Sequence, residues 1–563
     1  MKLKPVFSVL LMLSLLLGSL FPAAAAEGAA DVSALYKNKD VDDTWSSDDA
    51  QPIDLDSVHD GIVTISGKGD YVLTGTLNGQ ILVEAPKDDK VRLILNGVTI
   101  TASSGPAIYE TQSDKLIITL AEGTVNTLTD GPMITDEDDT IGAALYAEDD
   151  LSINGTGTLI ANGTRKHGIQ SKADLVIANG NITVTAVTDG IRSRNSLLVL
   201  SGTLNITSGG DGLATTRTDA EGKGWMVLAG GSVTVKAGGG AGTVRASANL
   251  RGGFGTRGRT DDGFGAADDA DNGMSRKAAK AASDLTVLGG AYVFDCADDG
   301  LHGVNVIVNG GTFEIKSGDD GMHADMEMSV NGGVIGITQC YEGIEGRNVT
   351  VSGGDIRIIS SDDGINASGG SDGSGFGGWG RGGYAASGDS GMLTITGGTI
   401  AVTAGGDGLD SNGSIAVTGG MTGLWTAGTG MEGPIDFNGS GTITGGTLIT
   451  ATAGVGGSRG RGGAGLSGLK TFTFSAPGEA GETITLTDKN GGMIGAFTPE
   501  NAFGALTVSS SVLADGSDFT LLVGSRMIES GTSADSVSSA TENAPGSGPY
   551  TNSEGHGHGR KGQ

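Results

Sequence analysis

Most of the chain consists of short runs in which apolar and polar residues alternate. Val306 and Val308, and then Phe313 and Ile315, are examples of apolar residues two positions apart. This two-residue period is typical of a strand that buries one face. The runs end at Gly-Gly, Asn-Gly or Asp-Gly, which are turn sequences. They are too short for a helical solenoid, whose helices need roughly ten or more residues. The pattern therefore predicts an all-β protein.

The alternating runs recur with a regular period between residues 284 and 366. Four near-copies each contain a polar or acidic step closed by a glycine, at Gly300, Gly321, Gly343 and Gly364, so the period is 21 or 22 residues. A repeat of this length with two or three strand-like runs fits one coil of a parallel β-solenoid. Equivalent residues of successive coils would stack about 4.8 Å apart.

The rest of the chain is interpreted around this solenoid. Residues 1–26 combine two lysines, an apolar run and Ala-Ala-Ala, which is the pattern of a secretory signal peptide. The other predicted parts are a flexible leader or N-terminal cap (27–52), the β-helix (53–470), a small antiparallel β cap (471–528) and a disordered tail (529–563). Glycine-rich insertions are expected near 215–223, 246–280 and 368–390.

Composition narrows the classes of partner. The chain has 563 residues and a formal net charge of −30, which argues against nucleic acid or an anionic membrane as a ligand. After the predicted signal peptide, no apolar run is long enough to span a membrane. The two cysteines, Cys296 and Cys340, lie two coils apart, which is too far for a disulfide, so they are predicted to be buried thiols.

Stacking the four copies aligns three columns of mostly polar residues. The position before each glycine holds Asp299, Asp320, Glu342 and Asp363. The position before that holds Asp298, Asp319, Tyr341 and Asp362. The position two residues after the glycine holds His302, His323, Glu345 and Asn366. Two like charges about 4.8 Å apart repel by about 0.9 kcal/mol in water, and more where water is excluded. A bare ladder of carboxylates would therefore oppose folding.

Several explanations of the carboxylates are open. One is a simple turn, in which Asp caps its own backbone and Gly takes a positive φ. Another is a hard cation held between neighbouring coils, and Ca²⁺ is favoured because it accepts about six to eight oxygen ligands in loose geometry. The doubled Asp-Asp exceeds what a turn needs. His302 and His323 would then be bystanders, hydrogen-bond donors or sugar contacts, and a zinc site built from them is a further alternative.

The glycine-rich insertions leave the coils beside the acidic columns. They contain aromatic residues, among them Trp379 and Tyr384, which could stack on sugar rings next to the calcium edge. The alternative is that these insertions are disordered, low-complexity loops.

The runs VLTGTLNGQILVEAP, VRLILNGVTITASSGPAIY, KLIITLAEGTVNTLTDG and SGDDGMHA resemble the secreted bacterial carbohydrate-binding domain family, which is built on a pectate-lyase-like right-handed β-helix. The resemblance covers about residues 53–523 and extends in architecture to polysaccharide lyase family 9. It implies binding to cellulose or to acidic plant polysaccharides such as pectate. It also implies calcium ligands drawn from Asp298, Asp299, Asp319, Asp320, Glu342, Glu345, Asp362 and Asp363. Tyr341 departs from this pattern, which puts a site in its coil in doubt.

These observations favour an exported, monomeric, calcium-dependent carbohydrate-binding protein that does not cleave its ligand. The candidate sugar contacts are His302, His323, Arg347, Trp379 and Tyr384. A polysaccharide lyase would need a cation and a base. Lys316, Arg347 and the two histidines lie near enough in the repeat to be considered as that base, but none sits in a lyase motif. A structural or adhesive surface protein is a further alternative.

Overall fold

A computed structural model describes residues 32–58, 61–132, 141–242, 274–367, 391–428, 433–454, 466–513 and 517–532. The predicted signal peptide, most of the two large insertions and the predicted tail beyond 532 lie outside these residues. No helix within the described part of the chain is both long and apolar enough to cross a bilayer. The described elements belong to a unit that begins at Val32.

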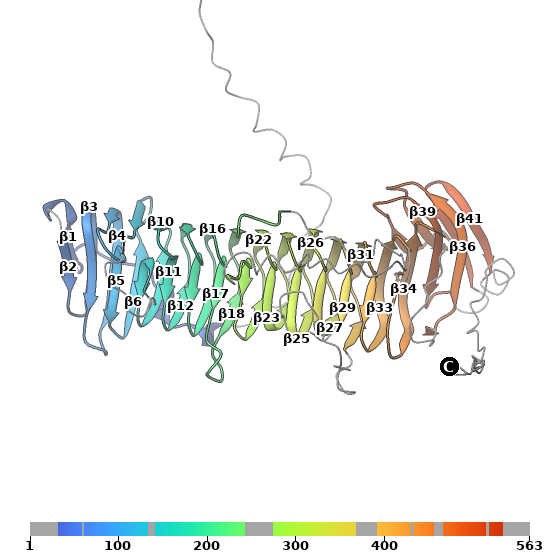
Figure 1. The fold of residues 1–563 in the computed structure, drawn as a ribbon, viewed down its shortest axis with the longest axis horizontal. Coiled ribbons are helices and arrows are strands. Elements are labelled where there is room, and N and C mark those ends of the chain that lie inside the picture. The colour runs from blue at the N-terminus through green and yellow to red at the C-terminus, as the bar shows by residue number, and fades with distance from the viewer. Residues whose placement is uncertain are drawn as a thin grey trace, which may run out of the picture. The chain divides into compact units, whose positions relative to one another are not determined.

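The described chain forms a parallel β-solenoid whose coils are stacked in chain order (Figure 1). Each regular coil contributes one strand to each of three ladders. The first ladder contains β7 (Val125–Thr129), β10 (Thr158–Gly163), β13 (Asn181–Ala186), β16 (Thr203–Ser208), β19 (Ser232–Ala237), β22 (Ala291–Cys296), β24 (Thr312–Ser317), β26 (Val334–Gln339), β28 (Asp355–Ser360) and β31 (Thr399–Ala404).

The second ladder follows the Asp-Gly turns. It contains β5 (Ile108–Gln112), β8 (Ala143–Ala147), β11 (His167–Ser171), β14 (Ile191–Ser193), β17 (Leu213–Thr215), β20 (Ala279–Lys280), the first parts of β23 (Leu301–Val308), β25 (Met322–Val330) and β27 (Ile344–Val351), and then β29 (Ile365–Ala367) and β32 (Leu409–Ser411).

The third ladder contains β6 (Lys115–Leu120), β9 (Asp150–Gly155), β12 (Asp174–Ile177), β15 (Ser196–Val199), β18 (Trp225–Leu228), β21 (Asp284–Val287), the second parts of β23, β25 and β27, and β30 (Met392–Ile395). At the N-terminal end the coils are formed by β1 (Gln51–Asp54), β2 (Gly61–Ile65), β3 (Gly69–Glu84) and β4 (Lys90–Thr101), and at the other end by β33 (Ser414–Thr426), β34 (Gly441–Thr452) and β35 (Ser467–Gly468).

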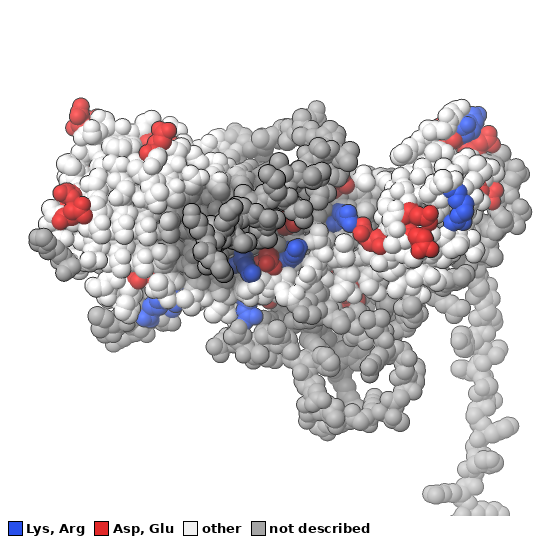
Figure 2. Space-filling view, turned by 90° about the horizontal axis from the view of Figure 1, so that it is seen from above, with Lys and Arg blue, Asp and Glu red and all other residues white. Residues whose placement is uncertain are grey.

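The period and the alternation predicted from the sequence are confirmed. In the first ladder Ala291 pairs with Thr312, Thr312 with Val334, and Val334 with Asp355, which are steps of 21 or 22 residues. Alternate apolar residues of the solenoid strands point inward and are buried in one continuous core, and the cap strands bury a second, smaller core. The outward residues are short and polar in many coils, and the face shown in Figure 2 carries its charged side chains in small separate groups.

The glycines of the Asp-Gly steps are required for a different reason from the one predicted. Gly300, Gly321 and Gly343 do not have a positive φ. A Cβ atom at these positions would lie 2.4, 2.5 and 2.3 Å from the carbonyl oxygen of the corresponding glycine in the next coil. The turn expectation of a positive φ is therefore wrong here, and close stacking of the coils excludes a side chain. Positive φ occurs instead in the Gly-Gly turns, as at Gly311 (φ +101°).

The solenoid has a cap at its C-terminal end, and the N-terminal segment packs against its coils. The C-terminal cap is antiparallel, as predicted: β39 (Phe503–Ser510) pairs with β34 of the last coil and with β36 (Thr471–Gly478). A separate antiparallel sheet contains β37 (Ile484–Asp488), β38 (Met493–Phe497), β40 (Asp518–Val523) and β41 (Arg526–Thr532). At the N-terminal end the segment of η1 (Ser33–Leu35), α1 (Asn38–Val41) and η2 (Leu55–Ser57) buries Asp40, which bonds to Lys115 and Ser152 at 2.6 Å each.

Two further details bear on the site. Cys296 and Cys340 are free, buried thiols, as predicted. The coil that follows the second insertion resumes before residue 280, because Ala279 and Lys280 pair with β17 and β23 in the second ladder. The end of the insertion predicted at 246–280 is thus part of the solenoid.

Candidate functional site

The column of residues before the second ladder joins coil to coil through its carboxylates. In each pair, one carboxylate oxygen accepts the backbone N–H at the same position of the next coil. The pairs are Asp189 with Asp211 N (3.1 Å), Asp211 with Lys277 N (2.8 Å), Asp299 with Asp320 N (3.2 Å) and Asp363 with Asp407 N (2.7 Å). The Asp at this position therefore stabilises the turn of the following coil.

At Asp299 the remaining charge is balanced by protein groups. Its Oδ2 lies 2.5 Å from Lys277 Nζ and 3.1 Å from His302 Nδ1, and all three side chains are buried. Burial alone would raise the pKa of Asp299, but Lys277 and His302 hold it well below its usual range. Asp299 is thus a neutralised carboxylate, which makes it a poor calcium ligand.

Further along the column, one imidazole faces two carboxylates: His323 Nδ1 lies 2.9 Å from Asp320 and 3.0 Å from Glu345, and these bonds raise the pKa of His323 although burial opposes the shift. We define the carboxylate cluster as Asp320, Glu342, Glu345 and Asp363. Burial raises the pKa of Asp320 well above its ordinary value, and the charge of Glu345 adds to the shift. Burial also raises the pKa of Glu342, and the charges of Glu345, Asp320 and Asp363 act in the same direction. These acids destabilise one another in the absence of a cation.

The chemistry of the cluster fits a hard cation such as Ca²⁺. Asn366 donates through Nδ2 to Glu342 Oε2 at 2.9 Å, and its buried Oδ1 has no hydrogen-bond partner in the described chain. A carbonyl oxygen beside several carboxylates is a typical set of calcium ligands. In the two coils that follow Asp363 and Asn366, oxygens of Asp407, Asp410 and Asp436 lie within 4.8 Å of one another and continue the same edge.

The outer acids of the Asp-Asp pairs do not join this cluster. Asp298, Asp319 and Asp362 are half-buried. Asp298 accepts the backbone N–H of Arg276 at 2.8 Å, and Asp362 is hydrogen-bonded to Tyr341, whose pKa is raised by burial and by this bond. The eight predicted ligands are therefore divided into an outer turn-forming set and an inner set that includes the cluster.

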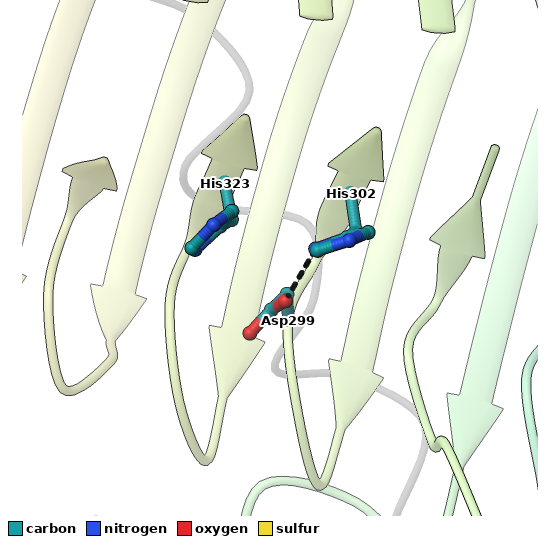
Figure 3. Close-up of side chains that lie close together, drawn as sticks. All are labelled: Asp299, His302 and His323. Carbon is teal, nitrogen blue, oxygen red and sulfur yellow. Dashed lines mark hydrogen bonds and ion pairs between the residues drawn. The ribbon is translucent and has the colours of Figure 1, made fainter. Parts of the chain in front are cut away.

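The two histidines form a stacked pair beside Asp299 (Figure 3). Their ring centroids are 5.0 Å apart, with 27° between the planes. The Nδ1 atoms of His302 and His323 face Asp299 and Asp320 at 3.1 and 2.9 Å. Their Nε2 atoms lie 4.0 and 3.8 Å from one oxygen of Asp325. His302 is thus oriented by one carboxylate and His323 by two, because Glu345 also lies 3.0 Å from His323 Nδ1, and both rings share Asp325.

A cavity of about 810 Å³ lies along the second ladder, from β11 to the start of β25. It is lined by five cationic side chains, Lys166, Lys172, Arg192, Arg194 and Lys280. Asp189, Asp211 and Asp325 also line it, as do His167 and His302. None of the lining side chains that the structure describes is aromatic. Arg192 is paired with Asp189 at 2.6 Å and Arg194 lies 3.8 Å from Asp219, but five cationic side chains against three lining carboxylates still give a local excess of positive charge in a chain with a net charge of −30.

The other predicted sugar contacts are not brought together with the cavity. Arg347 lies on β27, 3.7 Å from Met326 Sδ, and does not line the cavity. Lys316 lies on β24 of the first ladder and is exposed. Trp379 and Tyr384 lie outside the described residues.

Sequence reasoning missed the cations and Asp325. Lys277 and Lys280 occur where the Asp-Gly step is replaced by Lys-Ala, within the predicted insertion. Lys172 and Arg194 each stand four places after a glycine that is recognisable in the repeat, so a column drawn further from the turn would have found them. Asp325 lies in a β-bulge, which the period does not reveal.

This chain is similar in sequence to proteins of one known family. The family of carbohydrate-binding domain-containing proteins matches residues 59–321 and 303–375, more than half of the chain. A carbohydrate-binding domain-containing protein from Acetivibrio thermocellus is 40% identical over 224 residues, which span 39% of this chain and 76% of that protein. The chain therefore belongs to the carbohydrate-binding domain-containing family.

One solved structure also matches. It is the polysaccharide lyase-like protein from C. thermocellum, a gadolinium derivative, with 26% identity and a TM-score of 0.36 over 50% of this chain and 95% of that chain.

Proposed function

We propose that this protein is exported and binds an acidic plant cell-wall polysaccharide, such as polygalacturonate, in a calcium-dependent manner and without cleaving it. The observation that carries the proposal is the cavity with five lysine and arginine side chains in a strongly acidic chain. Cellulose, the neutral alternative, gives no reason for this charge. Membership of a carbohydrate-binding family supports a polysaccharide as the ligand. The positive charge of the cavity supports a negatively charged one.

The spacing of the cations suits a repeating polyanion. Gln170 of β11 pairs with Arg192 of β14, so Lys172 and Arg194 follow neighbouring strands of the second ladder. Lys280 ends β20, two coils further on. The cavity crosses six neighbouring strands, which corresponds to about 24 Å along the stack. A linear chain with a carboxylate on each sugar would meet cationic groups in three of these six coils, those of β11, β14 and β20.

Calcium would act at the carboxylate cluster. The cavity ends near Asp325 of β25, and the cluster begins at Asp320 in the same coil and extends into the following coils. A cation held by Glu342, Glu345, Asp363 and Asn366 would supply positive charge where the lysines and arginines end. A bound glycan could then find favourable charge beyond the cavity as well as within it.

Affinity electrophoresis on polygalacturonate, with and without Ca²⁺, tests the proposal. The triple variant Lys172→Ala, Arg194→Ala and Lys280→Ala should lose at least about tenfold in affinity, or about 1.4 kcal/mol. The matched control replaces Lys236 and Lys316, two exposed lysines on the first ladder, and should bind like the wild type. Raising the salt concentration should weaken binding, because exposed charges are screened. Equal loss in both variants, or equal binding to neutral cellulose, would contradict an acidic ligand.

One observation favours a lyase as a second candidate. His302 lines the cavity and its Nδ1 faces a buried carboxylate, which is how an imidazole base is oriented. Burial lowers the pKa of His302, and Lys277 acts in the same direction, so the ring is neutral near pH 7. Incubation with polygalacturonate and Ca²⁺ would distinguish the candidates, since β-elimination leaves an unsaturated product that absorbs in the ultraviolet. A steady rise that disappears in His302→Gln would replace the binding proposal with the lyase.

A further inference from the structure

The two stacked histidines have an arrangement that hydrogen bonding within the fold does not explain. Each ring uses Nδ1 to face the buried Asp of its own coil, Asp299 or Asp320. The two Nε2 atoms then face the same oxygen of Asp325, at 4.0 and 3.8 Å. Those distances are too long for hydrogen bonds. His323 Nε2 is buried without a hydrogen-bond partner in the described chain, and the side chain is only 5% exposed.

Asp325 reaches this position through an irregularity of the second ladder. The register shifts between Gly303 and Asn305 on β23, and between Ala324 and Glu327 on β25. Asp325 and Met326 thus occupy a bulge of β25, opposite single residues on both neighbouring strands. A β-bulge re-aims side chains and is frequent beside functional sites. Here it turns a carboxylate toward the paired imidazoles.

We propose that His302 Nε2, His323 Nε2 and the Asp325 carboxylate form a binding site for a divalent transition metal of the Zn²⁺ class. Metal-binding histidines usually have the other ring nitrogen bonded to a carboxylate, which fixes the ring and makes it a stronger ligand. Asp299 and Asp320 hold that place for the two rings. Two imidazoles and one carboxylate are the ligands of several catalytic zinc sites, where further positions remain open.

Metal binding at this site requires Asp325 and both imidazole rings to move together. Zinc ligands bind at about 2.0–2.2 Å, so two ligand atoms of one site lie about 3.3 Å apart. The Asp325 oxygen would have to approach each Nε2 by about 0.5–0.7 Å. Asp325 is 30% exposed and can move, whereas the histidines are held by buried carboxylates. The two rings would also tilt toward each other, from a centroid distance of 5.0 Å.

Charge and access favour the same site. Asp320 and Glu345 face His323 at 2.9 and 3.0 Å, and their negative charge, with that of Asp325, attracts a divalent cation, whereas the charge of Asp299 is balanced by Lys277. Asp325 and His302 both line the cavity, which gives a metal ion a route from the solvent. The open positions of the metal would face the cavity that is proposed to hold the glycan. This site is separate from the proposed calcium site, because imidazole suits zinc and is a poor ligand for calcium.

Titration with Co²⁺, a spectroscopic substitute for Zn²⁺, tests the proposal in the full chain after treatment with a chelator. His556 and His558 are replaced by Gln in every sample, because they could bind metal outside the site. The expected result is one equivalent of Co²⁺ with visible absorption bands, displaced by one equivalent of Zn²⁺ but not by excess Ca²⁺. His302→Gln and His323→Gln should weaken binding by more than about 100-fold, and Asp325→Asn by about tenfold or more.

The matched control is His167→Gln, a buried histidine of the same ladder whose Nδ1 lies 2.8 Å from Thr188 Oγ1. It should leave the cobalt spectrum unchanged, as should Glu342→Gln in the carboxylate cluster. Far-ultraviolet circular dichroism checks that each variant folds. Asp325→Asn keeps the test valid if a histidine variant does not fold, since Asp325 is partly exposed. Absence of cobalt bands in the folded parent protein, or bands that persist in Asp325→Asn and in either folded histidine variant, would overturn the proposal.

Discussion

Asp299 accepts a hydrogen bond from the backbone N–H of Asp320, at 3.2 Å, and so ties one coil to the next. Its second oxygen is held by Lys277 and His302. Both oxygens are therefore engaged by the protein itself. The acidic column is a structural connection at this coil, and it becomes a candidate cation site in the following coils, where Asp320, Glu342, Glu345 and Asp363 gather beside the single imidazole of His323.

The effects of replacing Lys277 and Asp299 on the free energy of unfolding should be strongly non-additive. Lys277→Met leaves a buried carboxylate with one partner fewer and should cost about 3–5 kcal/mol of stability. Adding Asp299→Asn removes the uncompensated charge and keeps an acceptor for the N–H of Asp320, so the double variant should be more stable than Lys277→Met alone. Denaturant unfolding of the four proteins in the cycle measures this. Simple additivity would show that the two charges do not interact.

The effect of Glu342→Gln on stability should change sign when Ca²⁺ is added. Without a cation this substitution relieves repulsion in the carboxylate cluster and should stabilise the protein by about 1–2 kcal/mol. With Ca²⁺ the wild type should gain more stability than the variant, because it retains the ligand. Melting curves in EDTA and in Ca²⁺ give both values. Asp355→Asn, on the exposed face of β28, is the control and should respond equally in the two conditions.

Glu110 should make stability depend on pH. It is buried on β5, where its Oε2 accepts the N–H groups of Glu148 and Asp149 at 2.9 and 3.1 Å. Burial, with the charge of Asp149, raises the pKa of Glu110 from 4.5 to about 7. The folded protein thus holds this proton more tightly than the unfolded chain. Stability from the group is present below about pH 4.5 and is lost as the pH rises to about 7, on the order of 3 kcal/mol.

Glu110→Gln should remove that slope. The variant should melt higher than the wild type at pH 8 and similarly at pH 4, and Glu122→Gln at an exposed position should leave the profile unchanged. Parallel wild-type and Glu110→Gln curves between pH 4 and 8 would refute the assignment.

The glycine of each Asp-Gly step should not tolerate alanine. In Gly343→Ala the new Cβ would lie 2.3 Å from the carbonyl oxygen of Gly364 and 2.4 Å from Ile358 Cγ2, so the coils must separate. We expect a loss of about 3 kcal/mol in thermal or denaturant unfolding. Gly67→Ala has nothing within 4 Å of its Cβ and an ordinary φ, and should be nearly neutral. Equal stability of the two variants would exclude close stacking as the reason for the glycine.

Much of this fold follows from the sequence because a solenoid repeats one local rule. The period of 21 or 22 residues determines which residues stack on one another. The sequence alone therefore predicts the columns that contain Asp299, His302 and their equivalents. The antiparallel cap was predictable because the period fails after residue 470. Calcium binding and the eight predicted ligands stay predictions.

The features of the site that the sequence did not predict lie in coils that depart from the regular repeat. Lys277 stands where an Asp was expected, and its coil was assigned to an insertion, so the neutralisation of Asp299 was missed. Asp325 depends on a bulge that changes pairing without changing the apolar pattern. The cationic side chains of the cavity come from the coils before the densest acids. The repeat positions that hold carboxylates do not include them.

The antiparallel pairing of β39 with β34 has a further consequence. A stack of parallel strands would otherwise finish with open backbone donors and acceptors, onto which a second molecule could be added in the manner of a fibril. Because β39, with β36 beyond it, is added in antiparallel orientation, a second molecule cannot continue the parallel ladder at this strand, which opposes end-to-end polymerisation.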